Sequence, residues 1–296
     1  MARTKQQNTE ETSDESAAAG QRILLIGGAM RSGTTIIHRA LCTAENCNPH
    51  LSESWLIRDI VTLYKNRVAR FESMGADQFG SIINFRELIR INVQYYIRLV
   101  SARYDDPEVL ILKHPELSRY FVELAGLFPG MQFLAVVRDP RDVIASMKEV
   151  QAQNARDGYE GPFSVFQNLQ QLCFYYHLHY ERLLAVDNAD PNRMRFLRYE
   201  DAMREPQTMI ADVGAMCGLR YEPEKIASFD ESRTASGTFD KKNRKADPLR
   251  RGFWSDLYTK DITEERIGRY KSILTDDEIK EVEKLLAMIG NRFGYW

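Results

Sequence analysis

Residues 28–35, with the sequence Gly-Ala-Met-Arg-Ser-Gly-Thr-Thr, have the residue types and spacing of a loop that binds a phosphate group. The apolar run Ile23–Ile26 before them predicts a buried strand, and a helix is expected to begin at Thr34. In such a loop the backbone N–H groups point inward, and the helix N-terminus adds partial positive charge. A simple Gly-Ser turn is the alternative. The strand before and the helix after favour a phosphate loop.

One position of this loop departs from the pattern of the nucleotide triphosphatases. The residue after Gly33 is Thr34, where those enzymes have the lysine that reaches the β- and γ-phosphates. The positive charge lies instead inside the loop, at Arg31 next to Ser32, and Thr34 and Thr35 add hydroxyl groups. Binding of a triphosphate with magnesium is hard to support without that lysine. The loop suits a phosphate esterified to a sulfate, a less charged group that can react without a metal.

A second motif follows another expected strand, Phe133–Val137. Arg138 stands at the carboxyl end of that strand, where ligands collect in open α/β sheets. Asp139 and Pro140 predict the start of a helix, and Ser146 lies two helical turns beyond Asp139. The arginine and the serine can therefore converge on one phosphate group. In the plainer alternative Arg138 pairs with an acidic neighbour and Ser146 is an ordinary helix residue.

The elements that position these motifs alternate between strand and helix. This alternation predicts a single α/β domain with a parallel sheet covered on both faces. Residues 1–20 are polar and are expected to form a disordered tail, which leaves residues 21–296 as the domain. The other strands are expected at Val109–Leu112 and Met194–Leu197, and the helices at Thr34–Ala44, Trp55–Met74, Phe85–Tyr104, from Asp139 onward, Phe163–Val186, Asp201–Cys217 and Asp276–Phe293.

The composition of the 296 residues is that of an ordinary globular enzyme, with 44% hydrophobic and 28% charged residues. A net charge of −2 favours neither nucleic acid nor an anionic membrane as a partner. Four unpaired cysteines and the lack of a signal peptide or an apolar span indicate a cytoplasmic protein. The segment from Phe229 to Ser255 is rich in Lys and Arg. It is either a solvated loop or a basic flap over an anionic ligand.

Taken together, these residues resemble the family of sulfotransferases that use 3′-phosphoadenosine-5′-phosphosulfate (PAPS). Arg31–Thr35 resembles the family's 5′-phosphosulfate loop, and Arg138 and Ser146 resemble its 3′-phosphate pair. The loop is closer to tyrosylprotein and bacterial sulfotransferases than to the cytosolic phenol and steroid enzymes. Weaker matches are Leu197-Arg-Tyr199-Glu-Asp201, Ile267-Gly-Arg-Tyr270 and Phe293-Gly-Tyr295.

The resemblance implies a fold like that of the P-loop nucleoside triphosphate hydrolases, with PAPS as donor and PAP as product. It also implies in-line transfer of the sulfuryl group without a metal. Tyr199, in the third motif, joins the loop residues, Arg138 and Ser146 as a donor-binding candidate. Because charge develops on the transferring group and on the leaving phosphate, we expect Arg31 and Lys113 to stabilise it. Lys113 can otherwise be a lysine that merely extends to the surface from a strand end.

An acceptor hydroxyl also needs a general base. Pro49–Glu53 resembles the segment that carries the catalytic glutamate of the tyrosylprotein enzymes, so Glu53 is one candidate. It can equally cap the helix expected from Trp55. His114, directly after Lys113, is the rival candidate. The other histidines (His38, His50, His177, His179) are expected on helix or loop surfaces, and Phe174, Tyr175, Tyr176 and Tyr180 are expected in the core or a cleft wall.

Two other functions fit parts of this pattern. A P-loop kinase for a small molecule would need magnesium and a substitute for the missing lysine, such as Lys113 or an arginine of the basic segment. A catalytically inactive nucleotide-binding protein would keep the fold alone. For an active sulfotransferase we expect a small-molecule acceptor, carrying a hydroxyl or an amine, rather than a protein or a glycan. The sequence leaves the oligomeric state open.

Overall fold

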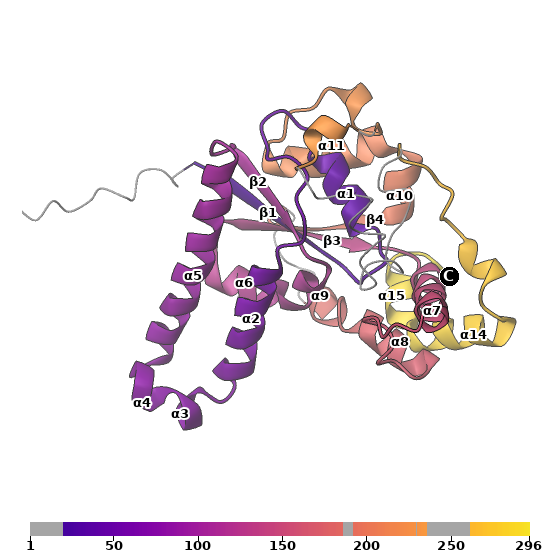
Figure 1. Ribbon diagram of the computed structural model, residues 1–296, viewed down its shortest axis with the longest axis horizontal. Helices are drawn as coiled ribbons and strands as arrows, with labels where there is room; N and C mark the ends of the chain where they lie inside the picture. The colour runs from indigo at the N-terminus through magenta and orange to yellow at the C-terminus, as the bar shows by residue number, and fades with distance from the viewer. Residues whose placement is uncertain (1–19, 186–191, 229, 236–260) are drawn as a thin grey trace, which may run out of the picture.

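A computed structural model describes residues 20–185, 192–228, 230–235 and 261–296 (Figure 1). The expected tail and most of the basic segment Phe229–Ser255 lie outside the described residues. The four described strands form one parallel sheet in the order β2-β1-β3-β4. The predicted α/β class and the parallel sheet are therefore confirmed. The strands are β1 (Arg22–Gly27), β2 (Val109–Lys113), β3 (Met131–Val137) and β4 (Met194–Arg198).

Helices cover both faces of the sheet because successive strand side chains point to opposite sides. Leu24 and Ile26 face α1 (Thr34–Leu41) and α11 (Pro206–Cys217), whereas Leu25 faces the layer that holds α2 (Trp55–Val68), α5 (Ile82–Arg103) and α6 (Phe121–Leu127). A third apolar cluster lies beside the phosphate loop and joins α7 (Pro140–Arg156), α8 (Leu169–His177), α14 (Asp276–Leu285) and α15 (Ala287–Arg292).

The remaining described elements are short. They are α3 (Phe71–Met74), α4 (Ala76–Phe79), α9 (Glu181–Ala185) and α10 (Tyr199–Arg204), with 3₁₀ turns η1 (Pro115–Tyr120), η2 (Pro223–Lys225), η3 (Glu231–Arg233) and η5 (Arg269–Ser272). None of the helices in this described part of the chain combines the length and the apolar character needed to cross a bilayer.

The prediction of one helix over Phe163–Val186 is wrong. The side chain of Asn168 accepts a hydrogen bond from the N–H of Gln171, so α8 begins only there. The chain then leaves the helical path between α8 and α9, where Tyr180 turns its hydroxyl towards β3. Side-chain hydrogen bonding that serves a distant strand therefore overrides a continuous apolar pattern.

Four other helices are shorter than the sequence pattern predicts. The pattern over Trp55–Met74 breaks after Val68, where the chain turns and buries Phe71 against Phe79 and Phe85. Pro206 cannot continue the preceding helix, so the expected helix over Asp201–Cys217 is divided into α10 and α11. The first helix ends at Leu41, and the last pattern divides into α14 and α15.

The segment between α1 and α2 is fixed to the sheet by one buried amide. Asn48 Oδ1 accepts from the N–H of Ile111 at 2.6 Å, and Asn48 Nδ2 donates to the carbonyl of Ile111 at 3.0 Å. This side chain therefore takes the place of a neighbouring strand at the edge of β2. It holds the segment that leads to Glu53 against the strand that ends in Lys113.

We expect Asn48→Ala to lower the free energy of unfolding by about 1–3 kcal/mol, because it leaves a buried N–H group and a buried carbonyl without partners. Urea denaturation followed by circular dichroism measures this change. Gln94→Ala, which removes an amide from an exposed position on α5, is the matched control and should stay within about 0.5 kcal/mol of the wild type. Equal stability of the two variants would contradict the role of Asn48.

Candidate functional site

The loop between β1 and α1 has a conformation that few residue types can adopt. Arg31 and Gly33 have positive φ angles of 74° and 94°. A Cβ atom at Gly33 would lie 2.4 Å from the ring of Tyr199, so only glycine fits there. Ser32 is fully buried, and its N–H donates to the carbonyl of Ala29 at 3.0 Å. The loop is therefore a tight turn that ends at the N-terminus of α1, as a phosphate loop requires.

Tyr180, from a distant part of the chain, supports this loop in addition to Tyr199. The hydroxyl of Tyr180 donates to the carbonyl of Val136 at 2.7 Å and accepts from the N–H of Ala29 at 3.0 Å. Burial raises the pKa of this hydroxyl, so it keeps the proton that it donates. The sequence placed Tyr180 only in a core or cleft wall. The sequence offered one indication of this supporting role, because a buried tyrosine needs a hydrogen-bond partner for its hydroxyl group.

Lys113, at the end of β2, connects the loop with the segment before α2. Its ammonium group donates to Thr35 Oγ1 at 3.1 Å and to Glu53 Oε1 at 2.8 Å. Lys113 is 2% exposed, whereas the side chain of Glu53 is 48% exposed. The lysine is therefore fixed inside the site and the carboxylate reaches its surface. Two residues that the sequence singled out separately are thus brought together.

His114 contacts the same carboxylate from the other side, with its Nε2 atom 3.8 Å from Glu53 Oε2. Its Nδ1 accepts the N–H of Glu116 at 3.2 Å, so the proton of the neutral ring is on Nε2. Burial lowers the pKa of His114 to about 4, with the carboxylate of Glu53 opposing this effect. At neutral pH the ring therefore offers a hydrogen-bond donor towards Glu53, not a free basic nitrogen.

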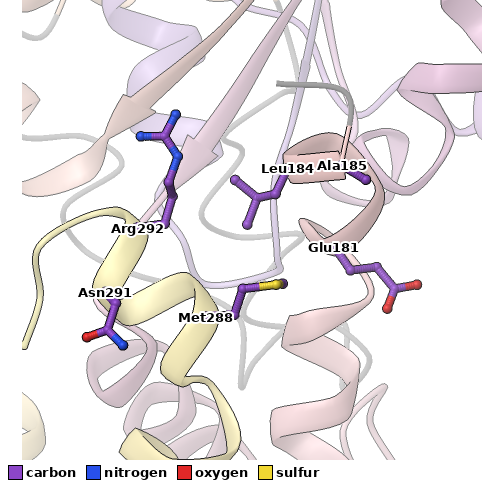
Figure 2. Close-up of a pocket in the computed structure, with 6 residues that line it drawn as sticks. All are labelled: Glu181, Leu184, Ala185, Met288, Asn291 and Arg292. Carbon is purple, nitrogen blue, oxygen red and sulfur yellow. The ribbon is translucent and has the colours of Figure 1, made fainter. Parts of the chain in front are cut away.

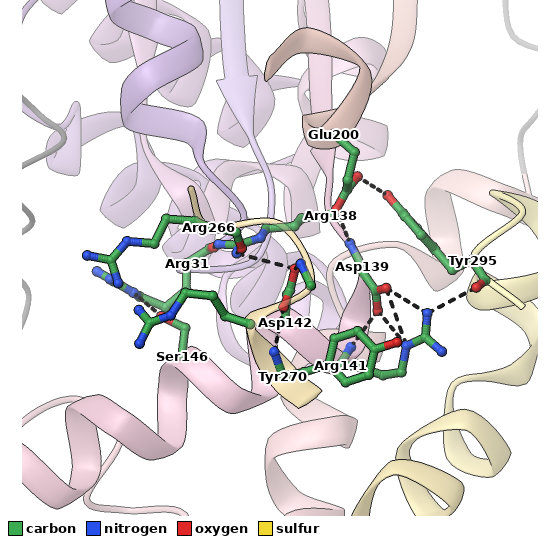
Figure 3. Close-up of polar contacts among 12 residues, drawn as sticks. Arg31, Arg138, Asp139, Arg141, Asp142, Ser146, Glu200, Arg266, Tyr270 and Tyr295 are labelled. Carbon is green, nitrogen blue, oxygen red and sulfur yellow. Dashed lines mark hydrogen bonds and ion pairs between the residues drawn. The ribbon is translucent and has the colours of Figure 1, made fainter. Parts of the chain in front are cut away.

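The second motif meets the phosphate loop through Arg31 (Figure 3). Arg31 Nε donates to Ser146 Oγ at 3.0 Å, and the carbonyl of Arg31 accepts from Arg138 at 3.1 Å. The guanidinium of Arg138 lies 4.7 Å from the ring centroid of Tyr199, the buried tyrosine beneath Gly33. Arg31, Arg138 and Ser146 therefore lie together at one edge of the loop. Tyr199 lies beneath them.

Acidic residues that the sequence did not single out hold this edge in place. The carboxylate of Asp142 accepts from the N–H groups of Gly268 and Tyr270 at 2.8 and 2.9 Å, and lies 3.5 Å from Arg138. Glu200 accepts from the N–H of Asp139 and from the hydroxyl of Tyr295, both at 2.9 Å (Figure 3). The two C-terminal motifs thus support the second motif. Burial raises the pKa of Glu200.

A sequence profile described as "Sulfotransferase family" matches residues 24–223, which contain the loop, Glu53, Lys113, His114 and the second motif. The match covers more than half of the chain.

The chain belongs to the sulfotransferase family. Its fold is also that of solved sulfotransferases. The sulfotransferase domain from the curacin biosynthetic pathway has a TM-score of 0.57 and 17% identity, with 90% of this chain and 98% of that chain covered. The domain from the olefin synthase of Synechococcus PCC 7002 has a TM-score of 0.53 and 14% identity over 89% and 94%. Sulfotransferase STF9 from Mycobacterium avium has a TM-score of 0.50 and 14% identity over 93% and 77%.

This sulfotransferase has a separate pocket between α9 and α15 (Figure 2), with a volume of about 530 Å³. Its lining residues are Glu181, Leu184, Ala185, Met288, Asn291 and Arg292. None of them belongs to the phosphate loop, to the second motif or to the group around Glu53. The pocket is therefore not part of the candidate active site.

The expectation that the remaining histidines lie on the surface is wrong for three of them. His38, His50 and His179 are at most 2% exposed. His38 lies behind the active site, with Nε2 3.3 Å from the carbonyl of Ile111, and its ring centroid is 4.5 Å from that of His50. Burial, followed by the charge of Lys113, lowers the pKa of His38 to about 3. Helix α1 has no exposed side at this position, because it packs between the sheet and the segment that contains His50.

This buried histidine predicts a loss of stability in acid. Between the unfolded-state pKa of 6.5 and the folded-state pKa of about 3, the unfolded chain binds the additional proton. The free energy of unfolding therefore falls as the pH falls below 6.5, by about 2 kcal/mol at pH 5 from His38 alone. Urea denaturation of wild type and His38→Gln at pH 8, 6.5 and 5 measures this contribution. The variant should lose less stability than the wild type between pH 8 and pH 5, and equal losses would contradict the account.

Proposed function

We propose that this chain transfers the sulfuryl group of PAPS to a hydroxyl group, or an amine, of a small-molecule acceptor. The observation that carries the proposal is the position of Lys113. Its ammonium group lies between the phosphate loop, at Thr35, and an acid that reaches the surface, Glu53. This arrangement supplies a cation where the donor's sulfuryl group would lie, with a base beside the acceptor position.

The residues around the loop fit the donor. Gly33 has no side-chain oxygen with which to cap α1, so the helix N-terminus can receive an anion. Arg138 is 7% exposed, and its Nε atom is buried without a hydrogen-bond partner among the described residues. Together with Ser146 and Arg31 it forms a basic edge suited to a second phosphate group. The donor, when bound, supplies a sulfuryl group attached to a stable leaving phosphate.

Within this proposal Glu53 is the general base. Its carboxylate is half exposed and can accept a proton from an acceptor hydroxyl. His114 is the weaker candidate because its Nδ1 already accepts the N–H of Glu116 and its neutral ring carries the other proton on Nε2. Its lowered pKa further disfavours proton uptake. His114 then orients the carboxylate of Glu53 from one side while Lys113 holds it from the other.

Arg31 and Lys113 are the groups that stabilise the charge developing during transfer. Each is fixed before any ligand binds, Arg31 by Ser146 and Lys113 by Thr35 and Glu53. Fixed charges need no reorganisation during the reaction, which makes their stabilisation of the transition state effective.

Substitution of Arg138 tests donor binding. We expect Arg138→Ala to weaken the binding of PAP at least tenfold in buffer with EDTA, because one positive charge and its donors are lost at the basic edge. Isothermal titration calorimetry gives the affinity. Arg67→Ala removes an exposed arginine of α2 and should bind PAP as the wild type does. Unchanged binding by Arg138→Ala would overturn its assignment to the donor site.

Substitution of Glu53 tests the base. Acceptors are first screened with ³⁵S-labelled PAPS, and the best one is used for rates. Glu53→Gln should lower kcat by about 10²–10⁴ because the proton acceptor is lost. The amide oxygen can still accept from Lys113, and PAP affinity should stay within about twofold because the basic edge around Arg138 is unchanged. His114→Asn should keep most of the activity, and Glu72→Gln, at an exposed position, all of it. An active Glu53→Gln with an inactive His114→Asn would assign the base to His114. Donor binding without turnover for any acceptor would favour the inactive alternative.

A further inference from the structure

Helix α5 is the outermost helix of the projecting pair that it forms with α2 (Figure 1). It has 22 residues and is therefore about 33 Å long. Its inner face is buried against the rest of the protein through Phe85, Ile89, Val93 and Ile97. This face accounts for the packing of α5 in the fold.

The same helix carries a second apolar face that the fold does not use. Leu88, Ile91, Tyr95 and Leu99 are 44%, 50%, 57% and 55% exposed. Their spacing of three, four and four residues places them along one side of the helix, away from the buried face. These four residues are called the outer stripe. Single exposed apolar side chains are common, but a continuous row of them marks an interaction site.

We propose that the outer stripe is the surface on which a second copy of this chain docks, with the two α5 helices antiparallel about a twofold axis. A twofold interface has to be complementary to itself. Val93 lies midway between Ile91 and Tyr95, and within half a residue of the midpoint of Leu88 and Leu99. A twofold axis that passes the outer stripe at the level of Val93 along the helix therefore places Leu88 opposite the partner's Leu99 and Ile91 opposite the partner's Tyr95.

The charges beside the stripe have the same symmetry. Glu87 and Arg98 are exposed, lie three helical turns apart and follow one side of the outer stripe. Their midpoint also falls beside Val93. In the antiparallel pair Glu87 lies against the partner's Arg98, and this ion pair occurs twice. A parallel pair would instead place like charges together.

The exposed area of the outer stripe is that of a modest interface. At about 200 Å² for a fully exposed large side chain, the outer stripe offers roughly 400 Å² per subunit. Standard interfaces bury about 800 Å² per partner. Flanking side chains, including Asn92, Ala102 and the two charged residues, supply the remainder. The dimer is thus expected to form at micromolar concentrations.

The experiment measures the mass of the full-length protein by sedimentation equilibrium between 1 and 100 μM. The wild type should be a dimer at the upper end of this range. Ile91→Arg and Tyr95→Arg place like charges next to the axis and should each give a monomer. Ile83→Arg replaces a 70% exposed residue of the same helix outside the outer stripe, and it should remain a dimer. Circular dichroism checks that each variant is folded.

A charge exchange makes the test independent of these apolar positions. Glu87→Arg and Arg98→Glu should each weaken the dimer at least tenfold, whereas an equimolar mixture of the two variants should form a heterodimer, because both ion pairs are then restored, one of them with its charges exchanged. A monomeric wild type at 100 μM would overturn the proposal, and so would a dimer unaffected by Ile91→Arg and Tyr95→Arg. A monomer that sediments with phosphatidylglycerol vesicles would also overturn it and assign the outer stripe to a membrane surface. None of these variants touches the proposed donor or acceptor site, so the outcome is independent of the proposed function.

Discussion

The buried ammonium group of Lys113 is the constraint on which the arrangement of the site depends. A charge removed from water is costly unless it is paired and hydrogen-bonded. Here Glu53 supplies the opposite charge and Thr35 supplies a second acceptor. This pairing fixes the distance between the phosphate loop, the end of β2 and the segment before α2. The side chain of Asn48, which precedes Glu53 in the same segment, also fixes this segment to β2, so the position of Glu53 does not depend on the ion pair alone.

The phosphate loop in turn depends on side chains that are remote in the sequence. Tyr180 joins it to β3, and Tyr199 fills the space that a side chain at Gly33 would occupy. The C-terminal part of the chain contributes through Asp142, which holds the backbone of Gly268 and Tyr270 beside Arg138. A loop with positive φ angles at Gly28, Arg31 and Gly33 is thereby kept in one shape before any ligand arrives. This rigidity is what electrostatic stabilisation of a transition state requires.

The sequence predicted the parts of the structure that local pattern determines. Short apolar runs predicted all four described strands, because buried parallel strands have few polar residues. Asp139 and Pro140 predicted the start of α7, which begins at Pro140. The loop of residues 28–35 and the second motif could be singled out because each directly follows a strand that the apolar pattern predicts. The prediction of one helix over Phe163–Val186 was wrong because a tertiary contact of Tyr180 interrupts the helical path.

Other features could not be predicted because they depend on contacts between distant elements. Nothing local distinguishes Asp142 or Glu200 from surface acids, and only the fold brings backbone N–H groups to them. The burial of His38 follows from the packing of α1 between two layers. The contact between Glu53 and His114 also depends on the fold. So does the hydrogen bond from the N–H of Glu116 to His114 Nδ1, which decides which nitrogen of the ring carries the proton. The likeness to the tyrosylprotein enzymes and the choice of acceptor remain predictions.

In the proposed function, the loop binds a phosphosulfate donor and not a nucleoside triphosphate. The most direct measurement compares PAP in EDTA with ATP in the presence of magnesium, both titrated into the unmodified full-length protein in a calorimeter. The account predicts that PAP binds at least tenfold more tightly, because Arg31, Arg138 and Ser146 offer a site for a second phosphate group and Thr34 replaces the lysine that a triphosphate needs. Tighter binding of ATP with magnesium would contradict the account and place the kinase alternative first.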